Sequence, residues 1–279
     1  MTLRQIDRRA GISPEEFYES YFKPGIPVVL TDLAKDWPAT QKWSFDYLIQ
    51  QYGHLEVPIV GPDFHKPGPN YMKSTQSMKL GDYLQLIRSE PTDYRIFLWN
   101  IFEHAPELRH DAPLPLEYAS GFRDKFPFMF FGGAGSATNL HYDIDCPNIF
   151  HTHFVTRKQF VLFDPTQGRN LYQHPFTLQS HVNPLKPDYD KYPALRKAVG
   201  YEAILHHGET IFMPPLWWHY IVYLDGGFSI ALRAKGNLLH QTRGAWNIVR
   251  HFVIDQGMNK MLGTRWKHWK EQQSFKRAI

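Results

Sequence analysis

From Phe126 onward the apolar positions form short runs that are separated by Gly, Pro and Asp. Runs of about four to eight apolar residues with such boundaries are typical of β-strands. Their close succession favours an antiparallel sandwich or barrel over βαβ units. The segment 164–200 is rich in proline, and we expect a long, partly irregular excursion there. The expected strands are FPFMFFGG, SATNLHYD, NIFHTHFV, KQFVLFDP, GETIFMP, HYIVYL and GFSIALR.

The N-terminal part of the chain mixes predicted helices with short strands. Ser13, followed by Pro14 and two glutamates, predicts the start of a helix. Two further helices are predicted at 43–52, ended by Gly53, and at 78–89. Their expected buried residues include Phe17, Tyr18 and Tyr21 in the first helix, and Leu80, Tyr83, Leu84 and Ile87 in the third. Strands are expected at 24–30, 57–60 and 94–100, and loops at 61–69 and 104–125, the second loop with a short helix.

After Gly236 the pattern becomes helical, with amphipathic segments predicted at 238–254 and 258–275. The second segment, GTRWKHWKEQQSFKR, is basic and carries two tryptophans three residues apart. This pattern favours a face that docks on the barrel or on a second subunit, and nucleic-acid contact is the alternative. We therefore divide the chain into residues 1–236 and a C-terminal helical segment, 237–279.

Composition narrows the class of protein. A chain of 279 residues can bury one sizeable core, and 15% aromatic residues exclude a disordered chain. The single cysteine, Cys146, excludes an internal disulfide and fits a reducing compartment. No charged-then-apolar leader and no run of 18 apolar residues is present, so we expect a cytoplasmic protein without a membrane span. The net charge of +4 is modest and fits a solvated surface.

Three residues carry a candidate metal chemistry. His141 and Asp143 form a His-x-Asp triplet, and His219 follows far downstream in PPLWWHYIVYL. About one such triplet is expected by chance in a chain with 15 His, but residues i and i+2 of a strand share a face and can chelate together. Two imidazoles and one carboxylate leave three positions open on an octahedral metal, as in non-haem Fe(II) oxygenases. The triplet at residues 54–56 lies at a helix-to-strand junction without a later partner, and we discount it.

With these residues in place, the chain resembles the JmjC-type, cupin-like 2-oxoglutarate oxygenases over roughly residues 14–235. It is nearer to the small hydroxylase branch, which includes asparaginyl and arginyl hydroxylases and the tRNA wybutosine hydroxylase, than to the large histone demethylases. The resemblance implies a double-stranded β-helix (jelly-roll) with a catalytic domain at 1–236, and a homodimer formed by the C-terminal helices. The matching stretches are PGIPVVLTDLAKDWPATQKWSFDYLIQQYG, MKLGDYLQLI, YRIFLWNIFEHAPEL, FFGGAGSATNLHYD and GETIFMPPLWWHYI.

The resemblance also implies residues for the cosubstrate. Lys158, which opens the apolar strand KQFVLF, matches the lysine that binds the far carboxylate of 2-oxoglutarate. A lysine on a core strand is costly unless it is paired, and a ligand carboxylate would pair it. Thr138 matches the family's Ser/Thr partner of the same carboxylate, and Asn148 matches an Asn that borders the metal site. Arg233 on the last strand is a second candidate cation. Snorkelling of Lys158 to solvent and a turn-capping role for Thr138 are the alternatives.

Three features depart from the family pattern. The spacing from Asp143 through Asn148 to Lys158 is longer than usual, which implies a bulge. Thr156 stands where a Gly is common, and Arg95 stands where relatives carry a cosubstrate tyrosine. His151 and His153 share one face of their predicted strand and are expected to line the pocket without binding the metal.

The sequence thus predicts an oxygenase that uses Fe(II), 2-oxoglutarate and O2 to hydroxylate a protein or peptide side chain, releasing succinate and CO2. Two alternatives stay open. One is a tRNA-base hydroxylase of the same chemistry, favoured by the basic C-terminal helix. The other is a non-catalytic cupin-like binding module, which has no need for an intact triad and a retained lysine. Substrate-setting residues are expected on the loops 61–69, 104–125 and 164–200.

Overall fold

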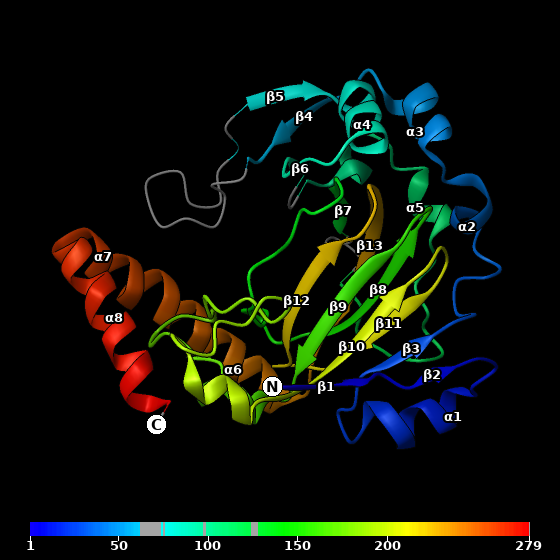
Figure 1. Cartoon of the computed structure of the whole chain (residues 1–279). Helices are drawn as coiled ribbons and strands as arrows, with labels where there is room; N and C mark the ends of the chain where they lie inside the picture. The colour runs from blue at the N-terminus through cyan, green and yellow to red at the C-terminus, as the bar shows by residue number, and fades with distance from the viewer. Residues whose placement is uncertain (62–73, 75, 97–98, 124–127, 279) are drawn as a thin grey trace.

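Two facing β-sheets form a jelly-roll sandwich (Figure 1). The computed structural model describes residues 1–61, 74, 76–96, 99–123 and 128–278. The predicted fold class, a double-stranded β-helix with flanking and C-terminal helices, is confirmed. The smaller sheet has the order β1 (Thr2–Gln5), β10 (Val199–Leu205), β9 (Lys158–Phe163) and β12 (Trp218–Tyr223). The larger sheet has the order β2 (Arg8–Arg9), β3 (Val28–Leu30), β11 (Thr210–Met213), β8 (Asn148–Phe154), β13 (Gly227–Ala234), β7 (Phe128–Gly132) and β6 (Arg95–Ile96).

The space between the two sheets is filled by alternate residues of their strands, because successive side chains of a strand point to opposite faces. Ile149 of β8, Phe160 and Leu162 of β9, and Ile221 of β12 meet there in one apolar cluster. The same faces carry the polar residues of the candidate site. The site therefore lies inside the sandwich and draws on both sheets.

Helices cover the outer face of the larger sheet. They are α1 (Pro14–Phe17), α2 (Pro38–Lys42), α3 (Phe45–Tyr52) and α4 (Leu80–Ser89), with α5 (Leu108–Asp111) in the expected loop. Phe17 contacts Phe150 and Phe212 of the sheet, with ring centroids 5.8 and 5.0 Å apart. Full burial of such a ring stabilises the fold by about 1.5–3 kcal/mol. A separate hairpin, β4 (Glu56–Ile59) and β5 (Gln76–Lys79), lies beside α4.

The N-terminal helix predictions hold with one correction. Ser13 caps α1, Ser44 caps α3 and Gly53 ends it, and the four predicted apolar residues of α4 are buried. Tyr18, however, is exposed, whereas Phe17 and Tyr21 are buried. The helix continues from α1 as the π-helical segment η1 (Tyr18–Phe22), whose wider turn leaves Tyr18 outside the buried stripe. The predicted loop at 61–69 falls, from residue 62 onward, outside the described residues.

The strand predictions need three further corrections. SATNLHYD forms no strand and is held by isolated bridges, in which His141 pairs with both Gln179 and His219. The short strands β1 and β2 were missed, as was β10 at the end of the proline-rich excursion. The excursion itself contains the 3-10 turns η3 (Pro165–Arg169) and η4 (Pro193–Lys197), and it covers the outer face of the smaller sheet.

The C-terminal segment contains more helix than predicted. The helical run is interrupted at Gly263 and not between residues 254 and 258. It contains α6 (Leu238–Ile248), the π-helical segment η5 (Val249–Asp255), α7 (Gln256–Leu262) and α8 (Thr264–Arg277). The predicted continuous helix at 258–275 is wrong, because Gly263 adopts φ of 53° and ends α7. After this turn α8 runs back beside α7 (Figure 1).

Trp266 of α8 contacts two other segments of its own chain, η5 and the excursion. Its indole nitrogen donates to Asp255 Oδ1 at 2.8 Å, and its ring lies 5.6 Å from that of Phe176 in the excursion. Lys270 pairs with the same Asp255 at 2.5 Å. Among the described residues, no helix combines the length and the apolar character that a membrane crossing requires.

Candidate metal and cosubstrate site

His141, Asp143 and His219 converge at one end of the sandwich interior. One ligand atom from each of them lies within 4.8 Å of the others. Asp143 Oδ1 is 3.7 Å from the Nε2 atoms of both histidines. Tyr142 points away and packs edge-on against Trp218 with ring centroids 4.9 Å apart. The three predicted metal ligands are therefore brought together, and two imidazole nitrogens and one carboxylate oxygen face a common point.

Backbone pairing fixes the two histidines in register. His141 N donates to His219 O at 3.1 Å, and His219 N donates to His141 O at 2.7 Å. Each imidazole has its Nδ1 beside a carbonyl oxygen, that of Asn139 at 2.7 Å and that of Trp217 at 3.1 Å. An Nδ1–H that donates to a carbonyl leaves the Nε2 lone pair free, which is the tautomer that a metal ligand needs.

The protonation states suit a metal ligand set at neutral pH. Burial alone would raise the pKa of Asp143, but the Arg233 guanidinium and the two imidazoles outweigh it and hold that pKa at about 2. Burial, together with the neighbouring His141, lowers the pKa of His219 to about 4. The carboxylate is thus charged and His219 is neutral, as a divalent metal ion requires.

Lys158 lies deeper in the sandwich and is fully buried. On β9 it pairs in register with Tyr223 of β12, four residues beyond His219. Its Nζ lies 3.1 Å from His151 Nε2, 3.0 Å from Tyr223 Oη and 2.8 Å from Ser229 Oγ. All three contacts are uncharged groups, because burial and Lys158 itself lower the pKa of His151 well below its usual value. Burial likewise lowers the pKa of Lys158 well below its usual value.

Thr138 lies between the metal ligands and Lys158. The segment that carries it runs antiparallel to β12, with Thr138 N donating to Ile221 O at 2.9 Å and Thr138 Oγ1 accepting from Ile221 N at 3.3 Å. Ile221 stands midway between His219 and Tyr223 on β12. Thr138 thus lies where a dicarboxylate that reaches from the metal ligands to Lys158 would pass. Its predicted hydrogen bond to the far carboxylate of 2-oxoglutarate stays a prediction.

Asn148 and Arg233 occupy other positions. The alternation of β8 puts Asn148 on the face of Phe150, opposite to His151, and its side-chain amide donates to Lys235 O at 3.3 Å. Arg233 is paired with carboxylates, with Nη1 2.7 Å from Asp143 Oδ2 and Nη2 2.5 Å from Asp145 Oδ1. The structure thus does not bring either residue to Lys158, and their cosubstrate roles stay predictions.

Sequence reasoning missed two residues that contact Lys158. Tyr223 and Ser229 contact Lys158 from β12 and β13, and only the strand alternation downstream of His219 signalled that they face inward. Arg95, the departure from the family tyrosine, is buried, and its guanidinium donates to Ala137 O and to Asp93 Oδ1 at 2.9 Å. Arg95 therefore contacts the backbone of the residue that precedes Thr138.

Comparison with known proteins defines the class. Residues 14–234 match the family model described as a cupin-like domain, and the chain belongs to that family, within its JmjC-type branch. The chain is 29% identical to lysine-specific demethylase JMJ30 of Arabidopsis thaliana, over 83% of this chain and 55% of that protein. It is 30% identical to JmjC domain-containing protein D of Dictyostelium discoideum, over 82% of this chain and 55% of that protein.

A third relative, tRNA wybutosine-synthesizing protein 5 of Gallus gallus, is 28% identical over 81% of this chain and 76% of that protein. The chain spans about half the length of the first relatives that it matches. The predicted resemblance to JmjC-type oxygenases is thereby confirmed. The cofactor prediction of Fe(II), 2-oxoglutarate and O2 is confirmed by this membership together with the His-Asp-His donor set.

Proposed function

We propose that this protein is an Fe(II)- and 2-oxoglutarate-dependent hydroxylase that acts on a protein or peptide side chain. The observation that carries the proposal is the pairing of two features in one interior. A His-Asp-His ligand set lies at one end, and the buried Lys158, whose hydrogen-bond partners among the described residues are all uncharged, lies further in. A buried cation without a counter-ion is costly, and a dicarboxylate would supply the missing charge.

In this proposal His141, Asp143 and His219 hold Fe(II), and Lys158 with Thr138 holds the far carboxylate of 2-oxoglutarate. The iron, when bound, supplies the O2 chemistry that couples decarboxylation of 2-oxoglutarate to oxidation of a substrate C–H bond. The chain itself orients the cosubstrate along β12 and keeps the His219 imidazole neutral through burial. It also excludes water from the Lys158 end, because the side chains around Lys158 are buried.

The test is an anaerobic titration of the metal-free protein with Fe(II) and 2-oxoglutarate, followed by admission of O2 and a succinate assay. We expect a weak visible charge-transfer band of the chelate and slow succinate release without substrate. His219→Ala serves as the control and should show neither signal. A protein that binds metal without this band would favour the non-catalytic binding module instead.

Hydroxylation of a tRNA base is the second candidate. It is favoured by the composition of α8, which carries five Lys or Arg against one Glu, and by the similarity to a tRNA wybutosine-synthesizing protein. Phosphate-dominated binding weakens steeply as salt rises. Binding of tRNA that is indifferent to salt would therefore count against this candidate. N-demethylation of a protein side chain is a variant of the same chemistry, since hydroxylation of an N-methyl group releases formaldehyde.

We further propose a cytoplasmic homodimer, with residues 237–279 as its interface segment. Support comes from a group of large apolar side chains that are exposed along α6, η5 and α7. Exposed apolar patches of this kind mark interaction sites in soluble proteins. Cys146, the single cysteine, is free and buried, which fits a reducing compartment. The exposed side chains are Leu238, Leu239, Trp246, Ile248, Val249, Phe252, Val253, Met261 and Leu262.

A further inference from the structure

Four side chains of alternating charge form a continuous chain that ends on the metal-binding carboxylate. Arg123 Nη1 lies 2.6 Å from Asp145 Oδ2, and Asp145 Oδ1 lies 2.5 Å from Arg233 Nη2. Arg233 Nη1 then lies 2.7 Å from Asp143 Oδ2. Arg233 and both aspartates are largely buried, with side chains 14–18% exposed. Charge-assisted hydrogen bonds of this length in a buried setting hold geometry strongly.

The two oxygens of Asp143 have separate partners. Oδ1 faces the Nε2 atoms of His141 and His219 at 3.7 Å each, whereas Oδ2 faces Arg233. A metal held at Oδ1 therefore leaves the contact of Oδ2 with Arg233 intact. A carboxylate that bound the metal through both oxygens would take one of the three open positions of a facial triad. The contact with Arg233 opposes that mode.

Backbone contacts restrain both halves of this chain of ion pairs. Arg123 N donates to Arg233 O of β13 at 2.9 Å, so the two arginines are held beside each other. The turn that carries both aspartates packs against α6, where Asn247 Nδ2 donates to Ile144 O at 3.2 Å and a Cβ on Gly244 would lie 2.9 Å from Asp145 O. An incidental surface ion pair requires neither restraint.

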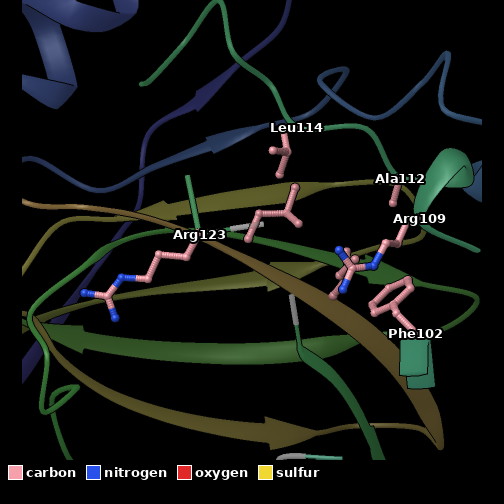
Figure 2. Close-up of a pocket in the computed structure, with 7 residues that line it drawn as sticks. Phe102, Arg109, Ala112, Leu114 and Arg123 are labelled. Carbon is pink, nitrogen blue, oxygen red and sulfur yellow. The ribbon is translucent and has the colours of Figure 1, made fainter. Parts of the chain in front are cut away.

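Arg123 also belongs to the wall of a separate cavity of about 160 Å³ on the outer face of the larger sheet. Figure 2 shows its side chain extending away from Arg109 and Phe102, which line the opposite side of that cavity. Its guanidinium is therefore directed toward Asp145 and not into the cavity. This orientation assigns Arg123 to the ion-pair chain.

We propose that Arg233 is a positioning residue for the metal, which holds Asp143 as a ligand through one oxygen, and that Asp145 and Arg123 hold Arg233 in place. This inference rests on the proposed metal site. It gives Arg233 a different task from the cosubstrate carboxylate, which is left to Lys158. Partners that orient a metal ligand in this way typically change metal affinity by about 10–100-fold when they are removed.

The test uses Co(II) as a spectroscopic probe in titrations of the metal-free full chain, with affinity from calorimetry and coordination from the visible spectrum of bound Co(II). We expect Arg233→Gln to weaken Co(II) binding about 10–100-fold and to alter the spectrum, since the freed carboxylate can bind through both oxygens. Asp145→Asn and Arg123→Gln should weaken it less. Their double variant should resemble Asp145→Asn alone, because the two residues act in series. Arg157→Gln, which breaks an exposed Arg–Asp pair elsewhere, is the matched control and should change nothing.

Circular dichroism checks that each variant is folded. If Arg233→Gln fails to fold, Arg233→Lys, Asp145→Asn and Arg123→Gln decide the matter, and unchanged affinity and spectra in all three overturn the inference. Folded Arg233→Gln with wild-type Co(II) affinity and spectrum also overturns it. A loss of 2-oxoglutarate affinity without a change in Co(II) binding does the same. These outcomes differ from failure of the metal site itself, which would appear as wild-type Co(II) binding by His219→Ala.

Discussion

Lys158 Nζ and His151 Nε2 lie 3.1 Å apart inside the sandwich, and both side chains are buried. The ammonium group donates its three N–H bonds to His151, Tyr223 and Ser229, and none of these partners carries a charge. This arrangement satisfies the three donors, but the positive charge stays unpaired, and this cost is why burial lowers the pKa of Lys158 well below its usual value. The predictions about the cosubstrate follow from this charge.

Lys158→Ala should weaken 2-oxoglutarate binding about 10–100-fold, because a hydrogen bond to a charged group contributes about 1.5–3 kcal/mol. Calorimetry with the Co(II)-loaded protein measures this. Lys158→Arg keeps the charge and should lose less. If Lys158→Ala leaves the affinity unchanged while Arg233→Ala destroys it without affecting metal binding, the carboxylate assignment is wrong.

Affinity for 2-oxoglutarate should fall as pH rises toward the usual lysine pKa, because burial lowers the pKa of Lys158 and the group loses its proton early. Without cosubstrate, the free energy of unfolding has the opposite dependence on pH and rises as pH rises. The unfolded chain binds the lysine proton more readily, so this residue lets the free energy of unfolding increase with pH between the lowered pKa and about 10.5. Thermal unfolding with and without 2-oxoglutarate across this range measures both trends. A parallel pH dependence in Lys158→Met would show that another group is responsible.

Asp143→Ala and His219→Ala should each abolish Fe-dependent succinate formation while the far-ultraviolet circular dichroism stays unchanged. Neither side chain belongs to the apolar clusters that hold the sheets together. Gln159→Ala, on the opposite face of β9 from Lys158, is a control that should retain turnover. Persistent succinate formation in either ligand variant would refute the triad.

Gly226→Ala should destabilise the protein by about 3 kcal/mol, because a Cβ there would lie 1.7 Å from Ile87 O at the end of α4. Gly257→Ala in α7 meets no atom within 4 Å and should stabilise its helix by up to about 1 kcal/mol. Urea unfolding of the two variants gives the comparison. Equal stabilities would show that the loop before β13 moves freely away from α4.

Val253→Glu should convert the proposed dimer to a monomer, because it places a charge in the exposed apolar group on α6, η5 and α7. Leu116→Glu is the matched control, since Leu116 is equally exposed at 66% but lies in the loop near α5. Sedimentation velocity over a range of concentrations measures both. A wild-type protein that is monomeric throughout would remove the dimer proposal.

The strands that carry the site were predictable because their alternation is strong. The alternation in NIFHTHF places His151 and His153 on one face of a strand, the resemblance implies an inward Lys158 at the start of KQFVLF, and the structure brings His151 and Lys158 together inside the sandwich. The strand β10 was missed because it directly follows a proline-rich segment, which predicts irregular structure and hides the alternation of its apolar residues. The strand β1 is short and polar, and it becomes a strand only by pairing with β10.

The rest of the site depends on contacts that leave no local pattern. Arg123 and Asp145 lie in two irregular segments, so neither period nor spacing announces their ion pair. The absence of a regular strand at His141 has a similar cause. Its backbone forms isolated bridges to two different residues, Gln179 and His219, instead of pairing along one neighbouring strand. Gly263 could have signalled the end of α7, but the helical spacing of Trp266 and Trp269 after it favoured one unbroken helix.

The mutual backbone hydrogen bonds of His141 and His219 join two segments that are far apart in the chain, so the ligand set exists only after the sandwich has closed. An ion that binds there binds the native state and not the unfolded chain. By mass action, free metal at 100 times its dissociation constant adds about 2.7 kcal/mol to the free energy of unfolding. Iron supply would then govern how long the folded molecule survives proteolysis, as well as whether it can turn over.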